Sequence, residues 1–165
     1  MDEYGAEFDT MENSKEYETL KIIKTNNSCS LCEDYVKQNV SKPLVVASCE
    51  GACLRGEIAR KTANILCHSL ATDKTVRLCL GSALTKEGGQ RSLVKNAEKI
   101  IAIEGCPVDC GSRMLKGLSE NIHPEVIRTD ILADFNKDLF GINEMSEEDI
   151  NKCALDVAKK IAEKL

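Results

Sequence analysis

Tryptophan is absent from this sequence, and aromatic residues make up only 4% of its 165 residues. The hydrophobic core must therefore be built mainly from Val, Ile, Leu and Ala. Long hydrophobic runs are also missing, since the longest, PLVVASC and KIIAIEGC, fall far short of the ~20 residues that a membrane-spanning helix needs. The first sixteen residues are acidic and polar rather than basic and then apolar. We therefore expect neither a secretory signal nor a membrane partner.

Clusters of lysine and arginine are missing as well. The chain carries 22 basic and 27 acidic residues, for a formal net charge of -5, and few aromatic residues accompany the basic ones. A nucleic-acid-binding surface has the opposite features, so we expect no nucleic-acid partner. The chain length predicts one domain. We expect residues 1–28 to be an acidic, partly disordered extension and residues 29–165 to be a single domain, which could also form a homo-oligomer.

Cysteine, in contrast, is abundant. The sequence has nine cysteines: Cys29, Cys32, Cys49, Cys53, Cys67, Cys79, Cys106, Cys110 and Cys153. Their odd number, the missing leader and the lysine-rich composition argue against a secreted disulfide framework and favour a cytoplasmic location. In a reducing compartment, cysteines bind metal, react, or fill core positions as small hydrophobic residues.

From residue 43 onward, short apolar segments alternate with amphipathic ones. The apolar segments predict strands at residues 43–49, 75–83, 100–106 and 125–132. The amphipathic segments predict helices at residues 56–70, 90–100, 110–122 and 146–165, the last with a capping box of Ser146 and Asp149. The preceding residues 26–43 resemble a polar loop. This alternation predicts an α/β fold: a mostly parallel, open sheet of about four strands with helices on both faces, a Rossmann-like three-layer arrangement.

Four cysteines fall where these predicted strands end. Cys49 ends the first strand, Cys79 lies late in the second, Cys106 ends the third, and Cys110 opens the next helix. Ligands of open parallel sheets bind beyond the carboxyl ends of the strands. Four thiolates there suit a tetrahedral soft-metal site, with zinc as the first choice and an iron–sulfur cluster as the second. The helices after Cys49 and Cys106 should also lower the thiol pKa. The competing interpretation is that these are ordinary small buried residues.

The same segments resemble a known family. PLVVASCEGACLRGE, VRLCLGSA, AIEGCPVDC and VIRTDI occur in the order found in DGC-domain proteins, which are described as zinc-binding, and the resemblance covers about residues 43–131. It implies a metal site formed by the four cysteines already selected, and it implies no reaction. Glu104 stands in place of the family's name-giving Asp, so a carboxylate is kept near the cysteines. Cys53 stands where the family has a small hydroxyl residue.

The remaining cysteines leave several interpretations open. Cys53 follows Cys49 at the spacing that separates Cys106 from Cys110, so it could be a redox partner, an alternative ligand, or part of a second site with Cys29 and Cys32. Cys29-x-x-Cys32 has the spacing of a zinc knuckle or a dithiol switch, and a mobile loop with two incidental cysteines is the alternative interpretation. Cys67 and Cys153 lie on the apolar sides of their helices, which predicts core positions.

Three catalytic or nucleotide-binding motifs compete with the metal site. GACLRGE imitates a phosphate-binding loop, but Glu57 occupies the position where a lysine must reach the phosphate, so we reject it. Cys49-x5-Arg55 resembles the oxyanion loop of low-molecular-weight phosphatases and arsenate reductases, in which the thiol attacks and the guanidinium binds the anion. No Asp-Pro loop supplies a general acid. A thioredoxin-like reaction at Cys29-x-x-Cys32 is the third alternative, so the sequence leaves enzymatic activity undecided.

Overall fold

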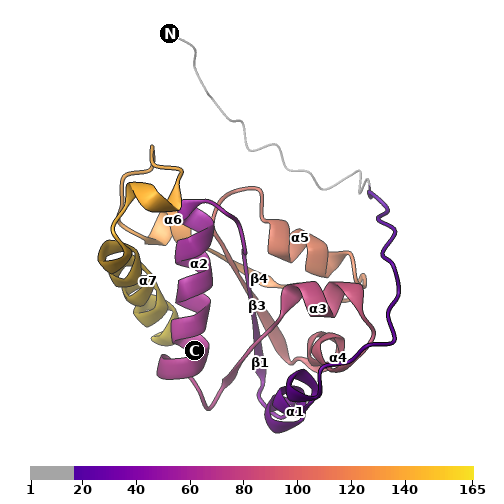
Figure 1. Cartoon of the computed structure of the whole chain (residues 1–165). Helices are drawn as coiled ribbons and strands as arrows, with labels where there is room; N and C mark the ends of the chain where they lie inside the picture. Colours follow the sequence, from indigo (N-terminus) through magenta and orange to yellow (C-terminus); the bar gives the residue numbers. More distant parts are fainter. Residues whose placement is uncertain (1–16) are drawn as a thin grey trace.

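The computed structural model describes residues 17–165, and the tail expected over residues 1–16 lies outside them. Four parallel strands form one sheet in the order β2-β1-β3-β4 (Figure 1). The strands are β1 (Leu44–Ser48), β2 (Thr75–Arg77), β3 (Lys99–Glu104) and β4 (Glu125–Arg128). In the centre, Val46 of β1 lies opposite Arg77 of β2 and Ile101 of β3. The short β-branched segments thus form the buried parallel strands that the sequence predicts.

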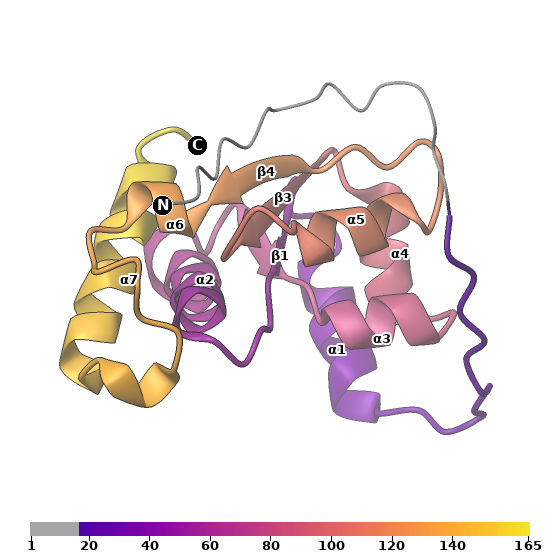
Figure 2. The ribbon, with the colours of Figure 1, turned by 90° about the horizontal axis from the view of Figure 1, so that it is seen from above.

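Helices cover both faces of this sheet. They are α1 (Ser30–Asn39), α2 (Leu54–Ile65), the π-helical turn η1 (Leu66–Leu70), α3 (Leu80–Thr85), α4 (Gly89–Asn96), α5 (Cys110–Lys116), α6 (Thr129–Leu132), the 3-10 turn η2 (Ile142–Glu144) and α7 (Glu147–Ala162). Figure 2 shows α2, α6 and α7 on one side of the sheet and α1, α3, α4 and α5 on the other. The predicted three-layer α/β fold is therefore confirmed.

Alternate residues of the central strands β1 and β3 build two separate cores. Val46 and Ile103 point toward α2 and α7, where Ile58 is fully buried. Val45 and Ile100 point to the opposite core, which they share with α1, α3, α4 and α5. The largest fully buried side chains are Leu, Ile and Val together with the carboxylate-bearing Glu104. A core without tryptophan is thus assembled from aliphatic residues, as expected.

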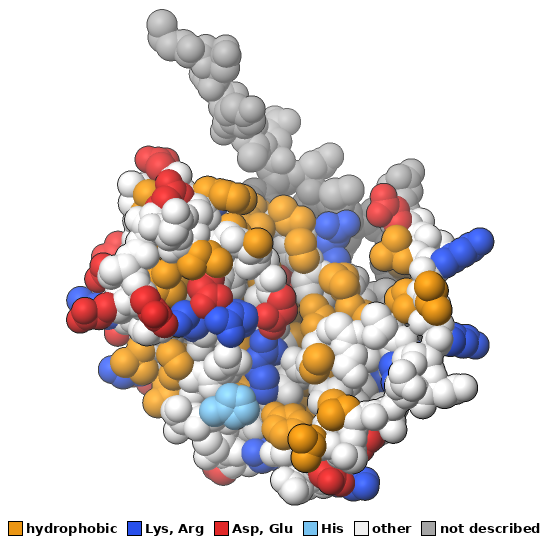
Figure 3. Space-filling model, in the orientation of Figure 1, with side chains coloured by type: hydrophobic (Ala, Val, Ile, Leu, Met, Phe, Trp, Pro, Cys, Tyr) orange, Lys and Arg blue, Asp and Glu red, His pale blue; other side chains and the backbone are white. Residues whose placement is uncertain are grey.

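Helix α7 is positioned by its cap and by polar contacts with α2. The side chain of Ser146 accepts a hydrogen bond from the backbone N–H of Asp149, at 3.1 Å, so the predicted N-terminal cap is present. On the outer surface, Lys61 of α2 donates to Asn151 at 2.8 Å and lies 3.5 Å from Glu147. Figure 3 shows acidic and basic side chains side by side over α2 and α7. No helix within residues 17–165 has the length and apolar character needed to cross a membrane.

Two predicted strands prove shorter than expected. The strand predicted at 75–83 ends at Arg77, whose backbone N–H and C=O both bond the hydroxyl of Tyr35 at 3.0 and 3.2 Å, so a side chain takes the place of a neighbouring strand. Residues 80–85 then form α3. The strand predicted at 125–132 ends at Arg128, and Thr129 begins α6 with its hydroxyl donating to the carbonyl of Glu104 at 3.1 Å.

Helical segments also differ from the prediction. The predicted loop at 26–43 contains α1, which was missed because only Val36 of that helix is buried and the apolar pattern is correspondingly weak. The helix predicted at 90–100 ends at Asn96 since Lys99 and Ile100 already belong to β3. The helix predicted at 110–122 ends at Lys116, before Gly117.

The sheet has a topological switch point between its two central strands. From β1 the chain passes through α2 on one face to reach β2, whereas from β3 it passes through α5 on the other face to reach β4. The connecting helices therefore leave β1 and β3 in opposite directions. A crevice at this position is where ligands of open α/β sheets bind.

Candidate functional site

Cys49 lies directly at the switch point, one residue after β1. Its backbone N–H donates to the carbonyl of Ile103 in β3 at 2.8 Å, and the residue is only 9% exposed. The sulfur accepts a hydrogen bond from the N–H of Gly51 at 3.4 Å. Cys49 is therefore fixed between the loops that follow β1 and β3.

The pKa of the Cys49 thiol is raised rather than lowered. Burial is the main cause, the backbone N–H groups of Gly51 and Gly105 oppose it only in part, and the charges of Glu104 and Cys110 raise the pKa further. The expectation that the following helix would lower this pKa is therefore wrong, because desolvation outweighs the favourable N–H groups.

Cys53 is a second thiol beside Cys49. It is the N-cap of α2, and its sulfur accepts a hydrogen bond from the N–H of Gly56 at 3.5 Å. Gly51 lies against both sulfur atoms: a β-carbon at this position would be 3.3 Å from the sulfur of Cys49 and 3.8 Å from that of Cys53. The Cys49-x3-Cys53 pair is thus brought together around one glycine.

The loops after β1 and β3 are in direct backbone contact. A β-carbon on Gly105 would lie 2.8 Å from backbone atoms of Arg55 and Gly56 at the start of α2. A β-carbon on Gly56 would in turn lie 2.9 Å from Gly51. Only glycines allow such an approach, and it keeps the turn leading to Cys106 against the loop that carries Cys49.

The turn from Cys106 to Cys110 contains a buried oxygen without a partner. Asp109 donates its N–H to the carbonyl of Cys106 at 3.2 Å and adopts a left-handed conformation with φ 50°. Its Oδ1 atom is buried and has no hydrogen-bond partner among the described residues. Cys106 is half-buried, and Cys110, the first residue of α5, is exposed. A buried carboxylate oxygen without a hydrogen-bond partner is a position that a cation would stabilise.

Glu104 supplies a second carboxylate at the same edge. It is 1% exposed, and its Oε1 accepts a hydrogen bond from the N–H of Ser112 at 2.6 Å. Its charge opposes ionisation of the Cys49 thiol. The carboxylate that the family resemblance implies near the cysteines is therefore present, and it is enclosed between the end of β3 and the start of α5.

Cys79 lies at the same edge but has different neighbours. It is the exposed N-cap of α3, and its N–H donates to Oε1 of Gln90 at 2.9 Å. The amide nitrogen of Gln90 donates to the sulfur of Cys32 at 3.4 Å. Cys29 is the N-cap of helix α1 and Cys32 lies in its first turn, so neither lies in the expected loop. No sequence pattern identified Gln90, since a single amide leaves no periodic signal.

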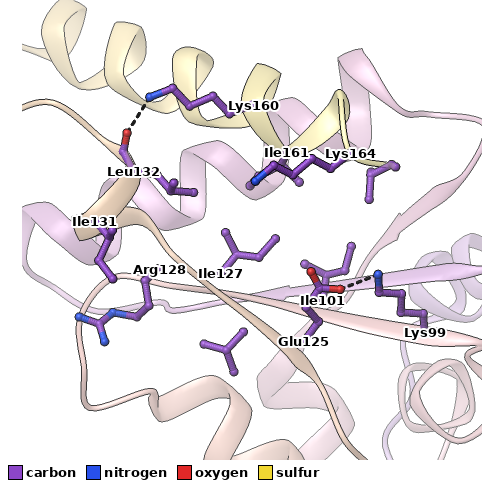
Figure 4. A pocket seen from close by; sticks show the side chains of 12 residues that line it. Lys99, Ile101, Glu125, Ile127, Arg128, Ile131, Leu132, Lys160, Ile161 and Lys164 are labelled. Atoms are coloured by element: carbon purple, nitrogen blue, oxygen red, sulfur yellow. Dashed lines mark hydrogen bonds and ion pairs between the residues drawn. The ribbon is translucent and has the colours of Figure 1, made fainter. Parts of the chain in front are cut away.

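The remaining candidate residues lie elsewhere. The guanidinium of Arg55 donates to the carbonyl of Lys137, so its observed partner is the segment after α6. Cys67 and Cys153 are buried in the core between the sheet, α2 and α7, as predicted. A hollow of about 360 Å³ between β4 and α7 is lined by twelve residues, among them Ile101, Ile127 and Lys160, and none of the twelve is a cysteine (Figure 4). This hollow is therefore separate from the thiol-bearing edge.

The predicted ligands share one edge without forming a ready-made metal site. Within residues 17–165, no three Cys, His, Asp or Glu side chains are gathered tightly enough to hold an ion. Cys49 is close to Cys53, whereas Cys79 is close to Cys32 through Gln90. The donor set still fits a soft metal, because the thiols are free and sulfur is the ligand that such ions prefer.

Comparison with known proteins gives one family. No curated protein and no solved structure matches the chain. The family model of the DGC domain matches residues 45–160, well over half of the sequence. This span contains Cys49, Cys79, Cys106 and Cys110 together with Glu104. The chain therefore belongs to the DGC-domain family.

Proposed function

We propose that this protein binds a soft metal in the cytoplasm. A single zinc ion is the first choice, and an iron–sulfur cluster is the second. The thiolates of Cys49, Cys79, Cys106 and Cys110 would be the ligands. The observation that carries the proposal is the position of Cys49 at the topological switch point, next to the turn in which the Oδ1 atom of Asp109 is buried without a partner.

The electrostatics of the crevice support a cation. Burial and the Glu104 carboxylate raise the pKa of Cys49, so that its thiolate is disfavoured in the metal-free protein. A divalent ion would reverse both effects, because it supplies positive charge and binds the deprotonated sulfur. Metal binding should consequently release protons, and the apparent affinity should increase as the pH rises.

The exposure of the ligands bears on the role of the metal. A site closed by four thiolates is structural, and its metal contributes directly to folding stability. Cys79 and Cys110 are exposed, however, and Cys53 lies next to Cys49 as a further thiol. Ligands that water and other thiols can reach favour exchange, so metal or sulfur handling suits this edge better than hydrolysis.

The alternative, a thiol enzyme using Cys49 and Arg55, has less support. A nucleophilic cysteine needs a lowered pKa, and that of Cys49 is raised. An oxyanion loop also needs its guanidinium beside the thiol, whereas Arg55 donates to the carbonyl of Lys137. Both observations disfavour attack by Cys49 on an anionic substrate.

Metal analysis of the full chain, purified without oxygen, tests the proposal. We expect about one zinc ion per chain and a loss of at least tenfold in zinc affinity, measured by competition with a chromophoric chelator, for Cys106→Ser and Cys79→Ser. Cys67→Ala and Cys153→Ala are the matched controls and should retain the ion, because these thiols lie in the core.

Other outcomes would replace the proposal. A broad visible absorption band with bound iron and sulfide would identify a cluster in place of zinc. Metal-free protein, or zinc binding that Cys106→Ser leaves unchanged, would refute the proposed ligands. Arylphosphatase or arsenate-reducing activity that disappears in both Cys49→Ser and Arg55→Ala would establish the thiol enzyme.

A further inference from the structure

A second cavity, on the α1 side of the thiol-bearing edge, has two cysteines in its wall. It measures about 510 Å³, and Cys32 from α1 and Cys79 from the start of α3 both line it. Cys32 is half-buried and Cys79 is exposed, so a small reagent can reach both sulfur atoms. These residues are 47 positions apart in the chain, and the fold alone brings them to one cavity.

One side chain connects the two cysteines. The carboxamide of Gln90, which is 4% exposed, accepts from the N–H of Cys79 at 2.9 Å and donates to the sulfur of Cys32 at 3.4 Å. Because a carboxamide is a small rigid group, Cys32 and Cys79 must be near neighbours. The sulfur of Cys32 and the backbone of Cys79 are thereby held at the two ends of one carboxamide.

Further contacts hold α1 in this position. The hydroxyl of Tyr35 bonds the backbone of Arg77 at the end of β2, and the carboxylate of Glu33 accepts from the N–H of Gly89 at 3.5 Å. The helix is thus attached both to β2 and to Gly89, the neighbour of Gln90 at the start of α4. Cys32 cannot move away from Cys79 unless these contacts break.

We propose that Cys32 and Cys79 form a redox pair that closes to an intramolecular disulfide. The oxidant is a small disulfide of the glutathione class. One cysteine, as its thiolate, attacks the oxidant, forming a mixed disulfide and expelling one thiolate. The second cysteine then attacks the protein sulfur of the mixed disulfide and expels the other. In total, two protein thiols are oxidised, one disulfide is reduced to two thiols, and both protons pass to the departing thiolates.

The pair would connect the redox state of the cell to the metal. This consequence rests on the proposed function, since Cys79 is one of the proposed ligands. A sulfur atom bound in a disulfide is no longer a thiolate and cannot ligate zinc. Oxidation should therefore reduce the zinc capacity of the protein, and reduction should restore it.

Peptide mapping of the full chain tests the pair independently of any metal. Reduced, chelator-treated protein is exposed to glutathione disulfide, quenched with acid, alkylated and digested with trypsin without reduction. We expect the peptides of residues 25–37 and 78–86 to be linked as the main product. A disulfide requires Cα atoms within about 7 Å, so this linkage reports directly on their proximity.

Variants separate the pair from its neighbours. Cys29→Ser should form the linkage at a rate within about twofold of the natural chain, whereas Cys32→Ser should abolish it. Gln90→Met keeps the size of the side chain but removes both hydrogen bonds, and it should slow closure severalfold. Cys67→Ala is the control for a distant thiol and should change nothing.

Two results would overturn the proposal: closure of Cys29 with Cys32 inside the peptide of residues 25–37, or no linkage at all. The metal proposal fails differently. If reduced protein binds no zinc while the linkage forms, the metal site is refuted and the redox pair stands. If reduced protein binds zinc while no linkage forms, the redox pair is refuted and the metal site stands.

Discussion

Single glycines determine how closely the loops at the crevice approach each other. Gly105 rests on the backbone of Arg55 and Gly56, at a distance that leaves no space for a β-carbon. This contact explains physically why glycine precedes Cys106: a larger residue would push the turn away from α2. The position of Cys106 relative to Cys49 thus depends on residue 105 having no β-carbon.

Gly105→Ala should therefore destabilise the protein. The new β-carbon would lie 2.8 Å from three backbone atoms, which cannot rotate away, so we expect a loss of about 1–3 kcal/mol as for other overpacked sites. Urea denaturation measures it. Gly81→Ala is the control, because a β-carbon there has no neighbour within 4 Å and α3 should gain about 0.5–1 kcal/mol. Equal stability of the two variants would contradict the proposed contact.

For individual residues, the sequence predicted the place in the fold better than it predicted the neighbouring side chains. Cys49 and Cys106 were placed at strand ends because buried β-branched segments stop there, and both lie as expected. The link from Cys79 through Gln90 to Cys32 was not predictable, since hydrogen bonds between distant residues depend on how α1 and α4 pack. The raised pKa of Cys49 was missed for a similar reason: burial at the crevice becomes apparent only once both loops are in place.

Among the elements, long amphipathic helices and central strands were predicted well. Helix α7 combines a broad apolar stripe with a recognisable cap, and β1 and β3 are continuous apolar segments. The short elements were missed. Helix α3 has six residues and α6 has four, too few for a periodic pattern, and α1 is largely exposed.

The cap of α7 gives a prediction at this scale. Ser146→Ala removes the oxygen that accepts from the N–H of Asp149, and it should cost about 1 kcal/mol of the free energy of unfolding. Urea denaturation of the variant gives the value. Ser69→Ala, in the exposed part of η1, is the control and should change stability by less than about 0.5 kcal/mol. A similar loss in both variants would rule out a specific capping effect.

For the whole molecule, buried ionisable groups predict the response to alkaline pH. Burial raises the pKa of Cys67, Cys153 and Tyr35. Above the ordinary pKa of each group, 9.0 for the two thiols and 10.0 for the tyrosine, the unfolded chain loses the proton before the folded chain does. Stability should therefore be constant below about pH 8 and fall as the pH rises further, by at most about 1.4 kcal/mol per pH unit for each group.

Urea denaturation of the reduced, metal-free protein between pH 7 and 10 measures this slope. Cys67→Ala should make the slope shallower whatever it does to stability at pH 7, since it removes one of the titrating groups. A slope identical to that of the natural chain would show that the thiol ionises equally in both states. Cys29→Ser, which changes an exposed thiol, is the matched control.

The backbone contact between Gly105 and the first turn of α2 also limits which ions could fit. Because main-chain atoms touch there, no side-chain movement can change the distance between the loops that follow β1 and β3. A metal ion of a different radius would have to be accommodated by rotation of the exposed side chains of Cys79 and Cys110. The rigid loops after β1 and β3 would then select ions by size, whereas the exposed cysteines would adjust to ions of different radius.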